Sequence, residues 1–183
     1  MLGVMPHTQA GSAPAPASID PSTLPGAEER SLLRDSLRGF LQAHWPVAEA
    51  VRRSDDVSAL AALWQGLVGQ GVATLGSDPT EGGLREAVLV MEELGRAAAP
   101  VPALGPLLVN LLLARQQQVD TALLQALHGG ALRLAVACAG LAADDDAGVL
   151  QLDAGEASGT LRFVDAGPSA THVLALADGG RAL

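Results

Sequence analysis

The sequence has few of the residue types on which several classes of protein depend. Its 183 residues include one cysteine, two phenylalanines, two tryptophans and no tyrosine, and lysine is absent, so all 11 basic residues are arginines. A lone cysteine, Cys138, excludes an internal disulfide and a multi-thiolate metal site, and it favours a reducing, cytoplasmic location. Because aromatics are scarce, the hydrophobic content of 49% predicts an aliphatic core.

Positive charge and long apolar runs are scarce as well. The formal net charge is -9, and no basic stripe interleaved with aromatics occurs, so nucleic-acid binding is not expected. The longest apolar run, residues 104–114, is about half of the ~20 residues that a membrane span requires. The composition therefore predicts a soluble protein without a membrane span.

Residues 1–26, rich in Ala, Pro, Ser and Gly, lack the pattern of a signal peptide and are expected to form a flexible tail. After this tail, five stretches have the apolar spacing of helices. Asp55 or Asp56 is expected to cap the second helix and Gly71 to end it. The fourth helix is apolar nearly all round, which predicts burial between other helices. The helices are predicted over residues 26–44, 54–71, 84–98, 102–116 and 119–130, and a short extended piece and a turn-rich loop over 72–83.

The pattern changes after Gly130. Short apolar or alternating runs, separated by Gly, Asp, Pro and Ser, predict strands over residues 132–139, 148–154, 160–166 and 172–177. The predicted fold class is α+β, with an all-helical N-terminal domain of about five helices over 27–130 and a partial antiparallel β domain over 131–183. Four short strands would leave their edges open, so we expect the chain to stop inside its second domain.

No local motif specifies a reaction. The sequence has no G-x-S-x-G, no glycine-rich phosphate loop and no Cys/His metal spacing. Glu92 and Glu93 are neighbours on a predicted helix and point about 100° apart, so they do not form a facing dyad. We expect one of them to be solvated and the other to pack or pair locally.

The other candidate groups also have simple structural interpretations. The acids at 144–146 are expected to face water rather than to hold a metal, because no further ligand has matching spacing. Cys138 lies in an apolar strand and is expected to be an inert core thiol. His44, His128 and His172 have no partner at diagnostic spacing, and His128 suits the last turn of a helix. We therefore predict no catalytic and no metal-binding residue.

Five segments resemble, in unbroken order, the N-terminal part of the FAD-dependent acyl-CoA dehydrogenases. The third carries a Glu-Glu-Leu-Gly helix end followed by Pro-x-Pro, and the last resembles a hairpin of the family's middle domain. Together they cover about residues 30–178. The segments are LRDSLRGFLQAHWP (33–46), LWQGLVGQGVATL (63–75), EGGLREAVLVMEELGRAAAPVP (81–102), LLQALHGGALRLAVACA (123–139) and ASGTLRFVDAGPSATHVLALA (157–177).

The resemblance implies a helical N-terminal domain, a β middle domain and a C-terminal four-helix domain. It implies FAD-dependent α,β-dehydrogenation of an acyl-CoA thioester, with electrons passed to an acceptor like electron-transfer flavoprotein, in a homo- or hetero-oligomer. The family's catalytic glutamate lies in the C-terminal domain. The resemblance thus assigns no catalytic residue here, and the isolated chain is expected to be inactive.

By resemblance, the cofactor-binding positions are Ala139, Phe163, Val164 and Asp165. Ala139 and Gly140 stand where the family has Thr-Glu, and Asp165 stands where it has threonine, beside a flavin that becomes anionic on reduction. These departures leave three explanations: a divergent member, a decaying copy, or a non-catalytic partner subunit that packs on a complete acyl-CoA dehydrogenase protomer. A helical interaction module without flavin ancestry is a further alternative.

Overall fold

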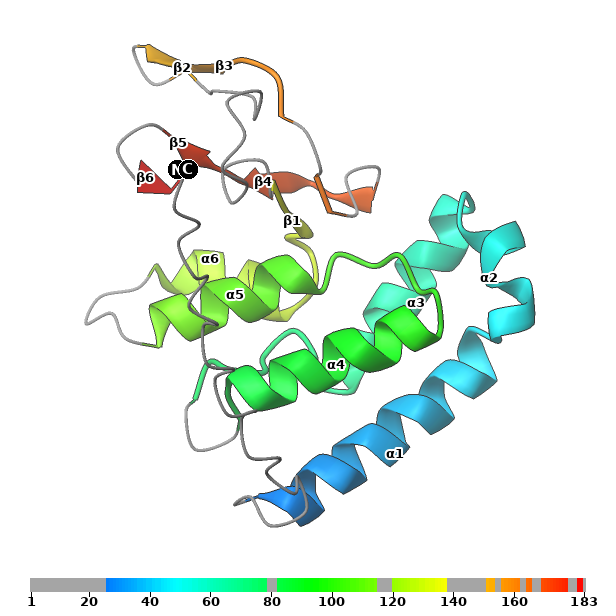
Figure 1. The fold of residues 1–183 in the computed structure, drawn as a ribbon. Helices are drawn as coiled ribbons and strands as arrows, with labels where there is room; N and C mark the ends of the chain where they lie inside the picture. The colour runs from blue at the N-terminus through cyan, green and yellow to red at the C-terminus, as the bar shows by residue number, and fades with distance from the viewer. Residues whose placement is uncertain are drawn as a thin grey trace, which may run out of the picture.

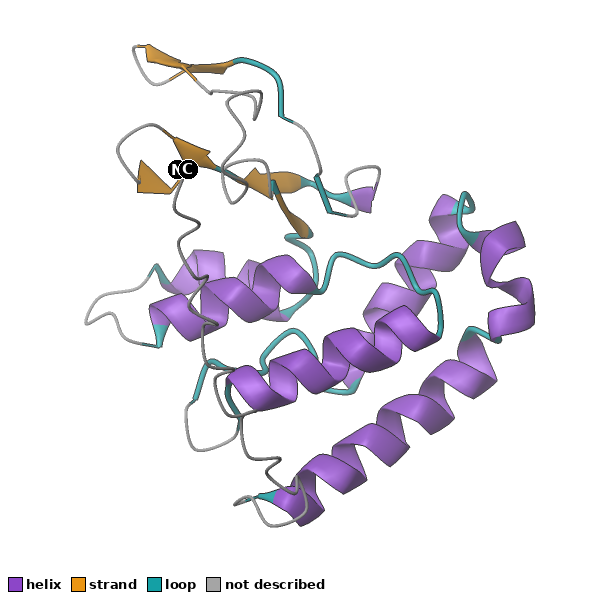
Figure 2. Cartoon of the chain, in the orientation of Figure 1, coloured by secondary structure: helices purple, strands orange, loops and turns teal. Residues whose placement is uncertain are grey.

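The fold begins with helices and continues with short strands (Figures 1 and 2). A computed structural model describes residues 26–78, 82–114, 120–137, 151–153, 156–161, 164–165, 169–177 and 181–182. Its six helices in those residues are α1 (Ala27–His44), α2 (Val47–Arg53), α3 (Val57–Gly69), α4 (Leu84–Arg96), α5 (Leu104–Leu113) and α6 (Thr121–His128). The strands there are β1 (Leu134–Val136), β2 (Gln151–Asp153), β3 (Glu156–Ser158), β4 (His172–Leu174), β5 (Leu176–Ala177) and β6 (Arg181–Ala182).

One hydrophobic cluster holds the helices together. α1 lies along α4 (Figure 1), and the buried side chains of α1, α3, α4 and α5 meet between them. Trp45 and Trp64 are the two buried aromatic members, and the rest is aliphatic, as the composition predicts. The members are Leu37, Leu41, Trp45, Ala50, Leu60, Leu63, Trp64, Leu67, Val72, Ala73, Ala87, Leu89, Val90, Leu94, Val101, Ala103 and Leu107.

The helix starts follow local sequence signals. The Asp56 carboxylate caps α3, because its Oδ1 accepts hydrogen bonds from the backbone N–H groups of Ser58 (2.9 Å) and Ala59 (3.0 Å). This confirms the predicted cap. The helix α1 ends at His44, two residues before Pro46, and Pro46 stands directly before α2, a seven-residue helix that the sequence analysis missed. The fixed φ of proline suits a helix start.

The helix α4 buries only some of its large residues. Ala87, Leu89, Val90 and Leu94 are buried, whereas Leu84 and Val88 are exposed. After Arg96 the chain turns at Ala98, which has a positive φ of 49°. Such a left-handed residue commonly ends a helix, although glycine is the usual choice.

Two expectations on the helical part were wrong in detail. Residues 70–76 form consecutive turns, with Gly71 and Gly76 at positive φ, so the expected extended piece is absent there. The helix α5 begins at Leu104 rather than Pro102, and its Leu112 is 58% exposed. The apolar helix α5 is therefore only partly buried by the described residues, whereas burial between other helices was expected.

The strands form three separate pairs rather than the expected antiparallel arrangement throughout. β1 and β4 are parallel, with Leu134 opposite His172 and Val136 opposite Leu174. The other two pairs, β2–β3 and β5–β6, are antiparallel. The long connection from β1 to β4 allows the parallel pairing, because a parallel neighbour cannot follow a tight turn. The strand predicted over 160–166 is reduced, in the described residues, to a bridge at Val164.

The helices and strands meet where α5 packs on β1. Gly105, in the first turn of α5, lies so close to β1 that an added Cβ would overlap the carbonyl oxygen of Leu134. A second link joins α3 to the same region, since Trp64 Nε1 donates to the carbonyl oxygen of Gly130 at 3.1 Å. The strand segment is thus positioned by the helices just before it begins.

Candidate functional site

Two of the four predicted cofactor-binding residues lie beside the end of β1. Val164 forms an antiparallel bridge with Ala137, and the Asp165 backbone N–H donates to the Val136 carbonyl oxygen at 2.9 Å. The other two, Ala139 and Phe163, lie outside the described residues. The structure therefore places these two neighbouring residues beside β1, and their assignment to a cofactor site stays a prediction.

The side chain of Asp165 is the notable group at this position. It is partly buried, and burial raises the pKa of its carboxyl group. Within the described part of the chain, Asp165 Oδ2 is buried without a hydrogen-bond partner. A carboxyl group in this situation keeps its proton to higher pH than usual and can then act as a hydrogen-bond donor.

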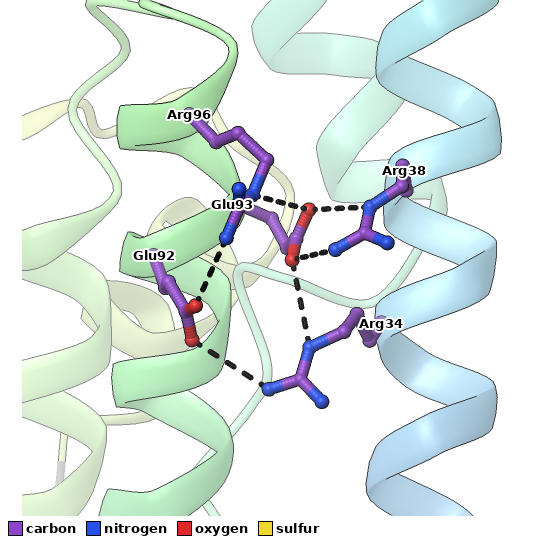
Figure 3. Close-up of polar contacts among 5 residues, drawn as sticks. All are labelled: Arg34, Arg38, Glu92, Glu93 and Arg96. Atoms are coloured by element: carbon purple, nitrogen blue, oxygen red, sulfur yellow. Dashed lines mark hydrogen bonds and ion pairs between the residues drawn. The ribbon is translucent and has the colours of Figure 1, made fainter.

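A second polar site lies between α1 and α4, around Glu93 (Figure 3). The Glu93 side chain is only 1% exposed. Arg38 binds it through two hydrogen bonds, Nη2 to Oε1 at 2.7 Å and Nε to Oε2 at 3.1 Å. Arg34 and Arg96 approach the same carboxylate at 3.5 Å and 3.7 Å. We call these three arginines with Glu92 and Glu93 the Glu93 cluster.

The two adjacent glutamates have the different roles that the sequence predicts. Glu92 is half-exposed and pairs with Arg96 at 3.2 Å and with Arg34 at 3.5 Å, whereas Glu93 is buried. The hydrogen bonds from Arg38 hold the pKa of Glu93 below its usual range, against the opposing effect of burial. Such an acid stays ionised and is a poor general base, since its lone pairs are already occupied.

A cavity of about 370 Å³ adjoins the Glu93 cluster. It lies where the end of α1, the start of α2 and the end of α4 meet. Its walls are mainly apolar, and its ionisable residues are Arg38, Arg96 and Glu93. The full lining is Arg38, Leu41, Gln42, Trp45, Pro46, Val47, Ala48, Glu93, Arg96 and Ala97.

The histidine near the end of α6 has a structural partner that sequence reasoning missed. The Asn110 side chain is fully buried and donates from Nδ2 to the carbonyl oxygens of Ala73 (2.9 Å) and Leu75 (3.0 Å). Its Oδ1 is thus the acceptor toward His128 Nε2, 3.0 Å away, and Nε2 carries the proton. Burial lowers the pKa of His128, so the ring favours its neutral form. The sequence signal that could have indicated this contact was Asn110, one asparagine inside an otherwise apolar run.

The other predicted candidates do not form a reactive group in the described residues. His44 Nδ1 lies 2.9 Å from the Phe40 carbonyl oxygen, and its ring stacks on Phe40. His172 Nδ1 lies 3.0 Å from Thr171 Oγ1 on the exposed β4. Among the described residues, no group of three or more His, Cys, Asp or Glu is placed to hold a metal ion. Cys138 and the acids at 144–146 lie outside them.

Comparison with known proteins identifies the helical part. The model of the acyl-CoA dehydrogenase N-terminal domain matches residues 27–119, about half of the chain. The chain belongs to the acyl-CoA dehydrogenase family, which confirms, over this range, the resemblance found in the sequence. No curated protein and no solved structure is significantly similar to it. None of the helices in the described ranges is long and apolar enough to cross a membrane.

The family is FAD-dependent, so the described β residues can be tested for their fit to a flavin. Val164 is half-buried and would offer an apolar wall. Asp165 fits when protonated, because its O–H is a donor like that of the threonine it replaces in the resemblance. An ionised Asp165 would repel an anionic reduced flavin. The raised pKa of Asp165 favours the form that fits.

Proposed function

We propose that the chain forms the N-terminal part of a FAD-dependent acyl-CoA dehydrogenase-like protein. We also propose a division into a tail (1–26), a helical domain (27–130) and the start of a middle β domain (131–183). The observation that carries the proposal is the family match over residues 27–119, followed in the fold by strands that begin at Leu134. The position of Val164 and Asp165 beside β1 supports it.

The proposed reaction is the α,β-dehydrogenation of an acyl-CoA thioester. FAD would accept the hydride from the β-carbon, and an acceptor like electron-transfer flavoprotein would then take the electrons. By resemblance the base that removes the α-proton belongs to a C-terminal helical domain, so we propose none of residues 1–183 for it. Glu93 is unsuited to that role, since three arginines hold it. The chain's own part is to position the flavin, with Asp165 as a donor.

A second candidate is a non-catalytic subunit that packs on a complete acyl-CoA dehydrogenase protomer. Exposed apolar side chains favour it: Leu84 and Val88 on α4 are 65% and 59% exposed, and Leu112 lies open on α5. Surfaces of this kind are often covered by a partner. Asp165 in place of a threonine also favours a chain that has lost contact with flavin.

One experiment separates the two candidates. The chain is combined with an acyl-CoA dehydrogenase C-terminal helical domain, or with a complete protomer, and bound flavin is followed by absorbance after gel filtration. The first candidate predicts flavin retained with the C-terminal domain, bleaching on addition of acyl-CoA, and tighter flavin binding by Asp165→Thr. Exposed Asp153→Asn is the matched control.

The second candidate predicts a different result. The chain would co-elute with the complete flavoprotein, and the substitution Asp165→Thr in the chain would leave the flavin spectrum of that flavoprotein unchanged. If the chain neither retained flavin with the C-terminal domain nor bound the protomer, both candidates would be wrong, and a module without flavin ancestry would be favoured.

A further inference from the structure

The cavity beside the Glu93 cluster has the size and the walls of a small-molecule site. Its volume of about 370 Å³ lies within the range of roughly 300–1,000 Å³ that is typical of ligand pockets. Leu41, Trp45 and Pro46 contribute apolar wall where α1 ends, and Ala97 contributes it where α4 ends. The cavity is therefore mainly apolar, and it is partly open to solvent at the surface of the helical part.

The ionisable residues that line one side of this cavity carry a net positive charge. Two arginines and one glutamate line it, giving 2 − 1 = +1, in a chain whose net charge is -9. Outside the wall, Asp35 and Glu92 act on Arg38, Glu92 also pairs with Arg96 at 3.2 Å, and Arg34 adds a third positive charge to the Glu93 cluster. The three arginines and two glutamates of the cluster thus keep a net charge of +1, and this side of the cavity favours an anion.

Arg38 and Arg96 each have N–H donors that their contacts with Glu92 and Glu93 do not use. A guanidinium has five N–H donors. Arg38 uses Nε and Nη2 for Glu93, and Arg96 uses Nε and Nη2 for Glu93 and Glu92. Among the described residues, Nη1 of neither arginine donates a hydrogen bond. Glu93 holds Arg38 through two hydrogen bonds, and Glu92 at 3.2 Å together with Glu93 at 3.7 Å holds Arg96 (Figure 3). Both guanidiniums are thus oriented before any ligand arrives.

We propose that this cavity binds a small free carboxylate with a short hydrocarbon body. The carboxylate is held by the guanidiniums of Arg38 and Arg96. The hydrocarbon packs against Leu41, Trp45 and Pro46. This inference does not rest on the proposed function, because the cavity involves neither Val164 nor Asp165.

The natural tryptophans provide the measurement. Trp45 borders the cavity, whereas Trp64 lies at α3 with its Nε1 bonded to Gly130, and the chain has two tryptophans and no tyrosine. Hexanoate is titrated into the full chain while tryptophan fluorescence is recorded, and hexanamide serves as the uncharged probe of nearly the same shape. We expect a saturable change with hexanoate and binding of hexanamide weaker by roughly tenfold. Trp64→Phe, which leaves Trp45 as the only tryptophan, should keep the signal.

Two variants test the assigned residues. Arg96→Gln should weaken hexanoate binding several-fold, and Arg52→Gln, an exposed arginine paired with Glu49 outside the cavity, should not change it. Ala97→Leu should reduce binding of both probes by filling space, with the helical circular dichroism unchanged. Ligand-induced shifts of the thermal midpoint give a second, independent readout.

The contrary results are equally specific. Equal binding of hexanoate and hexanamide would overturn the carboxylate assignment. Equal effects of Arg96→Gln and Arg52→Gln would overturn the role of Arg96. The absence of any saturable fluorescence change or midpoint shift in the folded wild-type chain would overturn the site itself.

Discussion

The helical part and the strand part of this chain treat a buried acid in opposite ways. Glu93, between α1 and α4, is almost fully buried and is held by three arginines. Asp165, beside β1, is partly buried, and its Oδ2 has no hydrogen-bond partner within the described residues. The pKa of Glu93 is lowered, mainly by hydrogen bonds from Arg38, and the pKa of Asp165 is raised by burial.

This difference shows which region satisfies its own polar groups. The helices share one hydrophobic cluster, and their buried polar side chains, Glu93 and Asn110, have partners from several elements. The described strands have two or three residues each and form three separate pairs. Short pairs with open edges are marginal alone. In the described residues, the acid whose Oδ2 has no partner thus lies in the less extensively packed of the two regions.

The largest effect is expected where the two regions meet. Gly105→Ala would place a Cβ against the backbone carbonyl of Leu134, which cannot move aside as a side chain can. We expect a loss of about 3 kcal/mol in the free energy of unfolding, measured by urea denaturation. Gly95→Ala is the matched control, since a Cβ there meets nothing within 4 Å. It should instead stabilise α4 by about 0.5–1 kcal/mol. Equal stability of Gly105→Ala and wild type would contradict the close α5–β1 contact.

The next effect concerns the buried amide of the helical part. Asn110→Ala removes the donors to the carbonyl oxygens of Ala73 and Leu75 and leaves these acceptors buried without them. We expect a loss of about 2–3 kcal/mol in thermal or urea unfolding. His128→Ala removes only the contact to Asn110 Oδ1 and should cost about 1 kcal/mol. If the two variants lost the same stability, the backbone contacts of Asn110 would not be the important ones.

The sequence predicted what depends on neighbours along the chain. The five expected helices are present, because apolar spacing and the Asp56 cap are local signals. The helix α2 was missed because seven residues after Pro46 are too few to show a period. The helix α4 was predicted correctly, but Ala87, Leu89 and Val90 face the core, whereas Leu84 and Val88 do not. Which residues of α4 face the core depends on how closely α1 packs against that helix.

The candidate site shows the same limit. Adjacent residues on a helix point about 100° apart, and the expectation that one of Glu92 and Glu93 is solvated while the other pairs locally was correct. That three arginines, two of them from α1, converge on Glu93 was not predictable, because their pairing depends on how α1 and α4 pack. The parallel pairing of β1 with β4 joins residues far apart in sequence and was also beyond local patterns.

The third prediction tests the acid of the helical part. Glu93→Gln keeps the shape of the side chain but removes its charge, and we expect a loss of about 2 kcal/mol at neutral pH. This is below the loss of about 3–5 kcal/mol for breaking a fully buried pair, because the arginines remain partly exposed to water. Glu92→Gln, at a half-exposed position, should cost less than about 0.5 kcal/mol.

The pH dependence of Glu93→Gln has a definite sign. Since the pKa of Glu93 is lowered in the folded state, its stabilisation is present above about pH 4.5, where an unfolded glutamate ionises. It is lost as the pH falls through the lowered pKa. The gap in unfolding free energy between wild type and variant should therefore narrow in acid. A gap that stayed constant down to about pH 2 would contradict the role of the Glu93 charge.

The smallest effect is expected for Asp165, the acid of the strand part, and its contribution to stability changes with pH in the opposite direction to that of Glu93. Because burial raises the pKa of Asp165, the folded state holds the proton more tightly, so ionisation destabilises it increasingly from about pH 4 upward. Asp165→Asn removes this cost, and we expect the variant to gain up to about 1 kcal/mol at pH 7 and to match wild type near pH 3. Exposed Asp153→Asn should change stability little at either pH. A loss of stability by Asp165→Asn at pH 7 would mean that the ionised carboxylate is stabilised in the fold, and the contrast with Glu93 would then fail.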